Sequence, residues 1–151
     1  MPFQIKWEIE GEVQLSRTLL IMSQRVKDWT PAFRDTATYL KDVFSSDVFA
    51  TQGGAIGEKW SPLKKGYALQ KSKRFPGQPI LVATGEMKNG FMTLWRPDMA
   101  QVWNKVEYFK YHQSNAPRSK LPRRVMMKLA NAQKEQVVRI FNTYFQQLVN
   151  K

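Results

Sequence analysis

The sequence predicts an α+β domain in which an antiparallel sheet packs against helices. Residues 3–15 alternate apolar and polar side chains, residues 30–48 carry apolar side chains at helical spacing, and residues 91–103 resemble two strands around a turn. The predicted order is strand, two helices, a long loop, strands and a final helix, which is typical of a sheet with segregated helices. A chain of 151 residues fits a single domain over 1–151.

The first predicted element is a strand. The stretch FQIKWEIEGEVQL places apolar residues at every second position, with polar residues between them. A period of two is that of a strand with one covered face. At Gly11 the strand would bend, bulge or turn into a hairpin. We expect residues 1–15 to form an extended strand or arm, which lies on its own domain or reaches a neighbouring subunit.

Two helices are expected next. Ser16 has the side chain of an N-cap, and the helix after it would present one apolar face made of Leu19, Met22, Val26 and Trp29. For the second helix, Thr30 would be the cap and Pro31 the first helical residue, where a missing N–H costs nothing. The buried stripe of the second helix consists of Phe33, Ala37, Leu40, Phe44 and Val48.

Residues 51–79 lose regular apolar spacing and are rich in Gly, Pro and Lys. They are therefore predicted to form a long irregular loop, and so long a connection inside a compact domain is usually functional or mobile. Trp60 and Leu63 would anchor this loop to the body of the domain. Further on, Thr84 can cap a short turn in which Gly85 supplies the backbone freedom that other residues lack.

The remaining elements are a hairpin and a long helix. Pro97-Asp98 has the composition of the central pair of a turn, so FMTLWRPDMAQVW is expected to be a hairpin. Residues 107–113 would be extended, and RRVMMKL after Pro122 would be a strand or the start of a helix. From about Asn131 the chain is predicted to be helical to its end. One side of that helix carries Val137 or Val138, Phe141, Phe145 and Leu148.

Charge is distributed unevenly along the chain, whose net charge is +12. Residues 1–58 carry six basic and eight acidic residues, a net charge of −2, whereas residues 59–151 carry eighteen basic and four acidic residues, a net charge of +14. Such an excess indicates a polyanionic neighbour or an acidic protein partner. A soluble protein that merely has a basic pI is the plainer alternative.

Known catalytic patterns are missing from the sequence. The chain has no Cys and a single His, His112, and it has no G-x-S-x-G elbow. The stretch GGAIGEK lacks the spacing of a phosphate-binding loop and a preceding apolar strand. A carboxylate-only site would have to draw on acids that are concentrated near the N-terminus. We therefore expect neither an enzyme nor a bound cofactor or metal.

No membrane segment or secretory signal is evident in the sequence. There is no long apolar run, and the opening MPFQIKWEIEGEV has no continuous hydrophobic stretch. Without Cys, the chain is expected to be made and folded in a cytoplasm. No membrane partner is predicted.

Binding to nucleic acid is the main alternative from composition. Basic residues near Trp60, Tyr67, Phe75, Phe109 and Tyr111 would combine phosphate neutralisation with base stacking. No named nucleic-acid signature occurs, so only non-specific contact with DNA or RNA is indicated. The opposing interpretation makes the aromatic residues core or interface and the lysines solvated.

Several short blocks follow one another in an order typical of a known family. They are WSPL at 60–63, Lys71, ILVATGEM at 80–87, YHQ at 111–113 and LPRR at 121–124. This order resembles the phage virion morphogenesis (tail completion) proteins, whose pattern runs roughly W-x-P-L, K, L-x-x-T-G-x-L, H-Q-x-G and I-P-x-R before a C-terminal helix. Two departures are Met87 in place of leucine, and Ser114-Asn115 where glycine often follows His-Gln.

The resemblance implies a structural virion protein of the phage neck. Such a protein would be a tail terminator or tail completion protein at the head–tail interface, or alternatively a head-side stopper or connector ring. It implies a homo-oligomer, most simply a hexameric ring, that contacts other neck proteins and tail tube or connector proteins, and also packaged DNA. The protein would be made in the host cytoplasm and located in the virion.

The resemblance and the charge together define two sets of candidate residues. Those expected to face DNA or a partner subunit are Lys64, Lys65, Lys71, Lys73, Arg74, Arg118, Lys120, Arg123 and Arg124. Those expected to support the fold as motif residues are Trp60, Pro62, Leu63, Leu81, Thr84, Gly85, His112, Gln113 and Pro122.

Three of these candidates carry specific expectations. Trp60 would be a core residue or a subunit contact. A neutral His112 at the end of the expected strand would bridge two backbone groups and hold the turn that follows, with a role in protonation as the alternative. The arginine pair at 123–124 would form an inter-subunit salt bridge, contact DNA or lie solvated on the surface.

Overall fold

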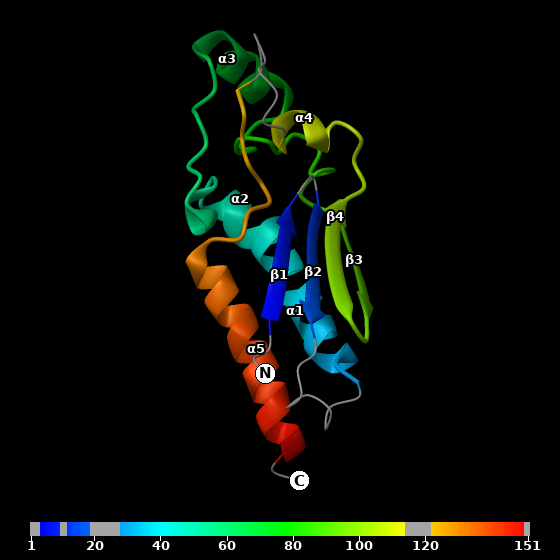
Figure 1. Ribbon diagram of the computed structural model, residues 1–151. Helices are drawn as coiled ribbons and strands as arrows, with labels where there is room; N and C mark the ends of the chain where they lie inside the picture. The colour runs from blue at the N-terminus through cyan, green and yellow to red at the C-terminus, as the bar shows by residue number, and fades with distance from the viewer. Residues whose placement is uncertain (1–3, 10–11, 19–27, 114–121, 150–151) are drawn as a thin grey trace.

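A computed structural model describes residues 4–9, 12–18, 28–113 and 122–149, the first two ranges by their backbone alone, and confirms the predicted α+β class. A four-stranded antiparallel sheet lies against the helix that begins at residue 30, and a long C-terminal helix runs along one side (Figure 1). The short helices α3 (Lys65–Arg74) and α4 (Phe109–Gln113) gather at the opposite end from the C-terminus (Figure 1).

The sheet joins the hairpin predicted at residues 91–103 to an antiparallel pair at the N-terminus, which agrees with the hairpin, one of three alternatives that the sequence left open at Gly11. Its strands, in the order β1-β2-β4-β3, are β1 (Gln4–Ile9), β2 (Glu12–Thr18), β4 (Met99–Asn104) and β3 (Phe91–Arg96). The register of β1 and β2 pairs Trp7 with Leu15 and Ile9 with Val13, so apolar positions meet at these two places. Pro97 and Asp98 form the turn between β3 and β4, as expected.

The first predicted helix is wrong at its start. Ser16 belongs to β2 and pairs with Met99 of β4, so it is not a helix cap. The alternation of apolar and polar residues continues to this point, and pairing with a second hairpin extends the strand. Residues 19–27, the middle of that predicted helix, lie outside the described residues.

The second predicted helix is confirmed. It comprises α1 (Thr30–Asp42), a π-helical turn η2 (Val43–Asp47) and α2 (Val48–Ala50). Its start is shifted by one residue, because Trp29 occupies the N-cap position and Thr30 is already helical. The capping side chain is that of Asp28, whose Oδ1 accepts the Thr30 N–H at 2.9 Å and the Thr30 hydroxyl. Both hydrogen bonds lower the pKa of Asp28, and the bond from the hydroxyl has the larger effect.

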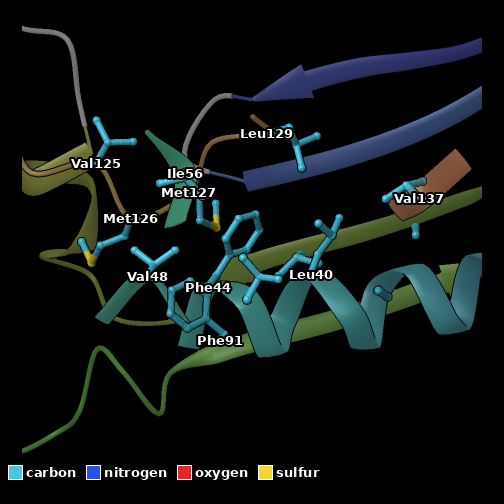
Figure 2. Packing of buried hydrophobic residues seen from close by; sticks show 14 of the residues in the cluster. Leu40, Phe44, Val48, Ile56, Phe91, Val125, Met126, Met127, Leu129 and Val137 are labelled. Atoms are coloured by element: carbon cyan, nitrogen blue, oxygen red, sulfur yellow. The ribbon is translucent and has the colours of Figure 1, made fainter. Parts of the chain in front are cut away.

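The hydrophobic core lies between this helix, the sheet and the C-terminal helix. All five residues of the predicted stripe are fully buried: Phe33, Ala37, Leu40, Phe44 and Val48. Figure 2 shows Phe44 and Leu40 beside Phe91 of β3, with Met126 and Met127 completing the same cluster. Phe33 meets Phe141 edge to face, with ring centroids 4.9 Å apart, and this contact joins α1 to the C-terminal helix.

The prediction of an irregular loop at 51–79 is partly wrong. A 3-10 turn η3 (Gly54–Ile56) and a helix α3 (Lys65–Arg74) lie within it. The helix has no apolar stripe, since Tyr67 and Leu69 are 57% and 60% exposed, and so periodicity could not reveal it. Good helix formers and a cationic last turn, which complements the helix dipole, account for its formation.

The segment 107–113 was predicted to be extended and is instead helical from residue 109. The two buried residues of helix α4 (Phe109–Gln113) lie four apart, on one helical face. Phe109 meets Phe91 edge to face at 5.7 Å and fixes α4 on the core.

The final helix is confirmed as α5 (Asn131–Val149), with Val137 and Phe141 buried and Val138 exposed. Residues 122–130 are neither strand nor helix, contrary to both alternatives. Within the described ranges, the helices are too short or too polar to cross a membrane.

Gly53 and Gly57 offer a matched test of how the chain leaves α2. Both have positive φ, 86° and 71°, but a Cβ on Gly53 would lie 1.9 Å from the Glu58 carbonyl oxygen, whereas one on Gly57 would meet nothing. We expect Gly57→Ala to lower the free energy of unfolding by about 1–2 kcal/mol. Gly53→Ala should cost about 3 kcal/mol or more, because the loop that leads to Trp60 must move. Urea denaturation measures both, and equal losses would contradict this placement of Gly53.

Candidate functional site

Much of the segment 122–130 is buried, although it belongs to no regular element; Arg123 and Lys128 are its exposed residues. Val125, Met126, Met127 and Leu129 are all buried. Buried backbone N–H and C=O groups need hydrogen-bond partners, which a sheet or helix normally supplies. Here side chains from other parts of the chain supply several of them: Trp60 and Gln113, which belong to the motif blocks, and Gln133 of the C-terminal helix, which does not.

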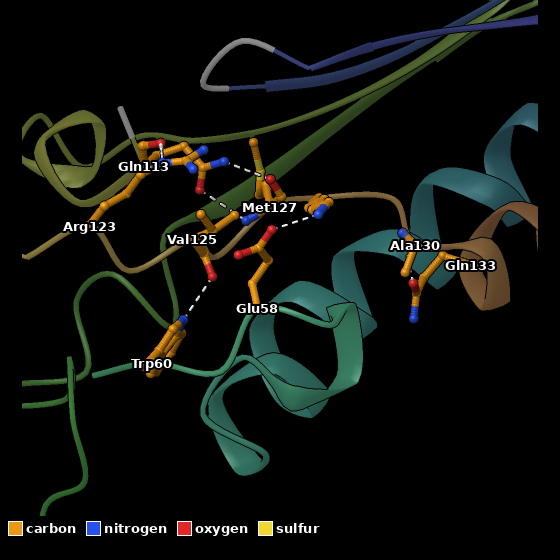
Figure 3. A network of polar contacts seen from close by, with 9 residues as sticks. Glu58, Trp60, Gln113, Arg123, Val125, Met127, Ala130 and Gln133 are labelled. Atoms are coloured by element: carbon orange, nitrogen blue, oxygen red, sulfur yellow. Dashed lines mark hydrogen bonds and ion pairs between the residues drawn. The ribbon is translucent and has the colours of Figure 1, made fainter. Parts of the chain in front are cut away.

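The side-chain amide of Gln113 takes the place of a neighbouring strand. Its Oε1 accepts the N–H groups of Met126 and Met127 at 2.9 and 3.0 Å, and its Nε2 donates to the Met127 carbonyl at 2.6 Å (Figure 3). Gln113 itself is 6% exposed. Two N–H donors on one oxygen fix the orientation of the amide, because the reversed amide would oppose donors with donors.

Trp60 holds the same segment from the other side. Its indole Nε1–H donates to the Val125 carbonyl at 2.7 Å (Figure 3). Its ring meets Phe49 edge to face at 5.3 Å, and the residue is buried. In the isolated chain Trp60 is thus a core residue, one of the two roles that the sequence left open.

The two ends of the segment are also fixed by hydrogen bonds. At one end, the Arg124 N–H donates to the His112 carbonyl at 3.0 Å. At the other, the Gln133 side chain accepts the Ala130 N–H at 3.1 Å (Figure 3) and donates to the Ala55 carbonyl at 2.9 Å. Gln133 is the third residue of α5, so its bond to Ala130 is that of a capping-box glutamine.

The sequence left three roles open for the arginine pair at 123–124, namely an inter-subunit salt bridge, a DNA contact or a solvated surface, and the structure places the two side chains differently. Arg124 is 5% exposed and donates from Nε to the Ser61 carbonyl at 2.9 Å and from Nη2 to the Pro62 carbonyl at 3.2 Å. It therefore joins two motif blocks and is not a surface contact. Arg123 is exposed, and its Nε donates to the Gln113 carbonyl at 3.2 Å.

Lys71 is also recessed, although the sequence placed it among the residues that were expected to face DNA or a partner subunit. It is 7% exposed on α3 and donates from Nζ to the Pro79 carbonyl. Burial is the main cause that lowers the pKa of Lys71, and the positive charge of Arg124 lowers it further. Sequence reasoning missed this burial because α3 has no apolar face on which an inward position would stand out.

A cavity of about 710 Å³ opens beside these two cations. Its lining brings together motif residues from all five blocks, namely Pro62, Leu63, Lys71, Leu81, Thr84, Gly85, His112, Pro122 and Arg124. We call it the Lys71–Arg124 cavity. The order of the blocks in the sequence thus corresponds to one place in the structure.

The backbone of the cavity wall adopts two left-handed conformations. Gly85 has φ of 84°, as the predicted turn requires, and the Asn89 N–H donates to its carbonyl at 2.9 Å. Leu81 has φ of 62°, which is unfavourable for a residue with a bulky side chain. Residues in such conformations persist where the surrounding structure holds them in place, and they cluster at functional sites. At the rim, the Tyr108 hydroxyl donates to Glu86 Oε2 at 2.8 Å, and burial together with this contact raises the pKa of Tyr108.

His112 lies in α4 and not at the end of a strand. It lines the Lys71–Arg124 cavity half-buried, and it is its carbonyl that holds the following segment, through Arg124. Within the described ranges, no cluster of three or more His, Cys, Asp or Glu is placed to hold a metal ion. The cavity therefore offers charge and apolar surface, and no nucleophile paired with a base is evident among its described residues.

The remaining basic candidates split into exposed residues and residues without a described position. Lys64, Lys65, Lys73 and Arg74 are exposed at or on α3. Arg118 and Lys120 lie outside the described residues. The exposed cations therefore share one short helix and its N-cap, on the side of the molecule where the cavity opens.

Comparisons with known proteins give no assignment: the chain matches no protein-family model, and neither curated proteins nor solved structures show a significant match.

The role of Gln113 is testable by removing its amide while keeping its length. Gln113→Met deletes three hydrogen bonds and leaves two buried N–H groups and one carbonyl unpaired, so the free energy of unfolding should fall by about 3–5 kcal/mol. Gln146→Met, on the exposed face of α5, is the control and should change it by less than about 0.5 kcal/mol. Urea denaturation of both variants measures the difference. Similar stabilities would mean that segment 122–130 does not depend on Gln113.

Proposed function

We propose that the chain is a structural protein of a phage neck, a ring subunit that joins or completes the tail at the head–tail interface. The observation that carries the proposal is that the motif blocks of the resemblance meet at one place. Trp60, Gln113 and Arg124 tie separate segments together through hydrogen bonds between their side chains and backbone groups. Residues used in this way explain why a structural family would need those residue types, without any role in catalysis.

Exposed apolar side chains support assembly into a ring. Tyr67 and Leu69 on α3 and Met92 and Trp95 on β3 are large and exposed. They lie on separate elements and do not form one contiguous patch, so the proposal uses them as single contact residues. On this proposal they contact neighbouring copies in a closed ring, most simply a hexamer, or contact other neck, tail tube or connector proteins. A head-side stopper ring is the variant of the proposal that places the same subunit on the capsid side.

Virion content tests the proposal directly. Particles of the phage that encodes the chain should contain it in a small, fixed copy number relative to the portal, as expected for a ring. Quantitative mass spectrometry of purified particles measures that ratio. Infected cells that lack the protein should accumulate separate heads and tails. Adding the purified protein to these heads and tails should restore their joining. Purified virions that contain none of the protein would contradict the proposal.

Non-specific binding to nucleic acid is the second candidate, and the exposed cations of α3 favour it. Four of them, Lys64, Lys65, Lys73 and Arg74, are exposed within eleven consecutive residues. Neutralising phosphates with such residues releases counterions and gives affinity that falls with salt. Arg124 cannot contribute in the same way, because its guanidinium is buried against carbonyl groups.

The salt dependence of duplex DNA binding tests this candidate. Replacing these four cations with Gln should reduce the slope of log affinity against log salt by about one for each phosphate that the variant no longer neutralises. Fluorescence anisotropy with a labelled duplex measures the slope, and Lys134→Gln on α5 is a control away from α3. Absent binding, or an unchanged slope in the fourfold variant, would exclude α3 as a DNA-binding surface.

A further inference from the structure

Two recessed cations line the Lys71–Arg124 cavity with hydrogen-bonding capacity to spare. The Lys71 ammonium has three N–H donors and gives one to the Pro79 carbonyl. The Arg124 guanidinium has five and gives one each to the Ser61 and Pro62 carbonyls. Among the described residues, no carboxylate forms an ion pair with either cation. The cavity therefore holds positive charge that carbonyl dipoles neutralise only in part.

The acid nearest to this charge is occupied elsewhere. Glu86 is the one carboxylate in the described lining, and it is exposed at the rim, where it accepts the Tyr108 hydroxyl at 2.8 Å. Burial and the charge of Arg124 act together to disfavour the charged form of Lys71. A negative group entering the cavity would offset the cost of burial and the repulsion, because an opposite charge at close range stabilises a buried cation.

The rest of the lining is largely apolar. Leu63, Leu81, Val82, Met87 and Pro122 form much of the wall. A pocket with apolar walls and a few convergent polar groups recognises a ligand that has the same mixture. The complementary ligand is an apolar group with one anionic group beside it.

We propose that the Lys71–Arg124 cavity binds a short peptide segment of a partner protein, in which an Asp or Glu carboxylate stands next to an apolar side chain. The carboxylate would meet the free N–H groups of Lys71 and Arg124, and the apolar side chain would lie against Leu63 and Leu81. This ligand is favoured over a DNA phosphate because both cations are more than nine-tenths buried and a rigid duplex cannot follow them inward. Apolar walls add nothing to the binding of a phosphate backbone.

The inference goes beyond the proposed function, since it assigns a ligand class to the cavity whatever assembly the chain enters. Its test uses the purified full-length chain and no virion. A failure would leave the neck proposal standing, and absence from virions would leave the cavity ligand standing.

A random library of short displayed peptides, selected on the immobilised chain, is the first step. The selected peptides should share an Asp or Glu beside an aliphatic or aromatic residue. A synthetic, fluorescently labelled peptide from the selection then gives an affinity by anisotropy. Changing its acidic residue to the corresponding amide should weaken binding about tenfold or more, because the amide cannot form the recessed charge pair. This comparison leaves the protein itself unchanged.

A matched pair of protein variants locates the binding. Lys71→Met and Lys73→Met remove the same charge from the same helix, but Lys71 faces the cavity whereas Lys73 is exposed. Lys71→Met should weaken the labelled peptide about tenfold or more, and Lys73→Met should leave it nearly unchanged. A short DNA duplex should not displace the peptide.

Three results would overturn the proposal. The first is a selection without enrichment of Asp or Glu beside apolar residues. The second is equal weakening by Lys71→Met and Lys73→Met, which would indicate general electrostatic attraction. The third is displacement of the peptide by duplex DNA together with a larger loss of DNA affinity in Lys71→Met, which would assign the cavity to phosphate.

Discussion

The hydrogen bonds between the side-chain amide of Gln113 and the backbone of Met126 and Met127 are the constraint on which this structure depends. They let a buried segment pass through the core without a neighbouring strand, since the amide offers both the donor and the acceptor that a strand would offer. Phe109 lies four residues earlier on the same face of α4 and packs on Phe91, so the position of the amide is fixed by the core itself. A single turn of helix thereby connects the sheet to the segment before α5.

Because the segment is held in this way, Arg124 is fixed with its guanidinium against the Ser61 and Pro62 carbonyls. Lys71 of α3 is also recessed, and it lies close enough to Arg124 for the two positive charges to repel each other. The basic character of the second half of the chain thus has two physical forms. Exposed cations on α3 are suited to a polyanionic surface, whereas the two recessed cations require a small, directed anion. The proposal for a peptide ligand rests on the recessed pair, and the proposal for DNA contact rests on the exposed cations, of which Lys64 also lines the cavity.

Elements with strong periodicity could be predicted from the sequence. Side chains that hydrogen-bond to the backbone in place of a neighbouring strand could not be predicted. The stripe that contains Phe44 and the helix that contains Phe141 have regular spacing, and both are confirmed. Helix α3 lacks an apolar face, so no periodic signal exists for it or for the burial of Lys71 within it. For the motif residue Gln113, the resemblance indicates structural importance, but its partners lie thirteen and fourteen residues away and depend on how the chain folds back.

Native-state hydrogen exchange at the amides of Met126 and Met127 tests this account most directly. If the Gln113 amide acts as a strand, both N–H groups should be protected to nearly the same degree as that of Val102 in β4, although segment 122–130 has no regular secondary structure. Both should lose that protection selectively in Gln113→Met, measured under conditions in which the variant remains folded. Exchange at the rate of an unstructured peptide in the unmodified chain would contradict the account.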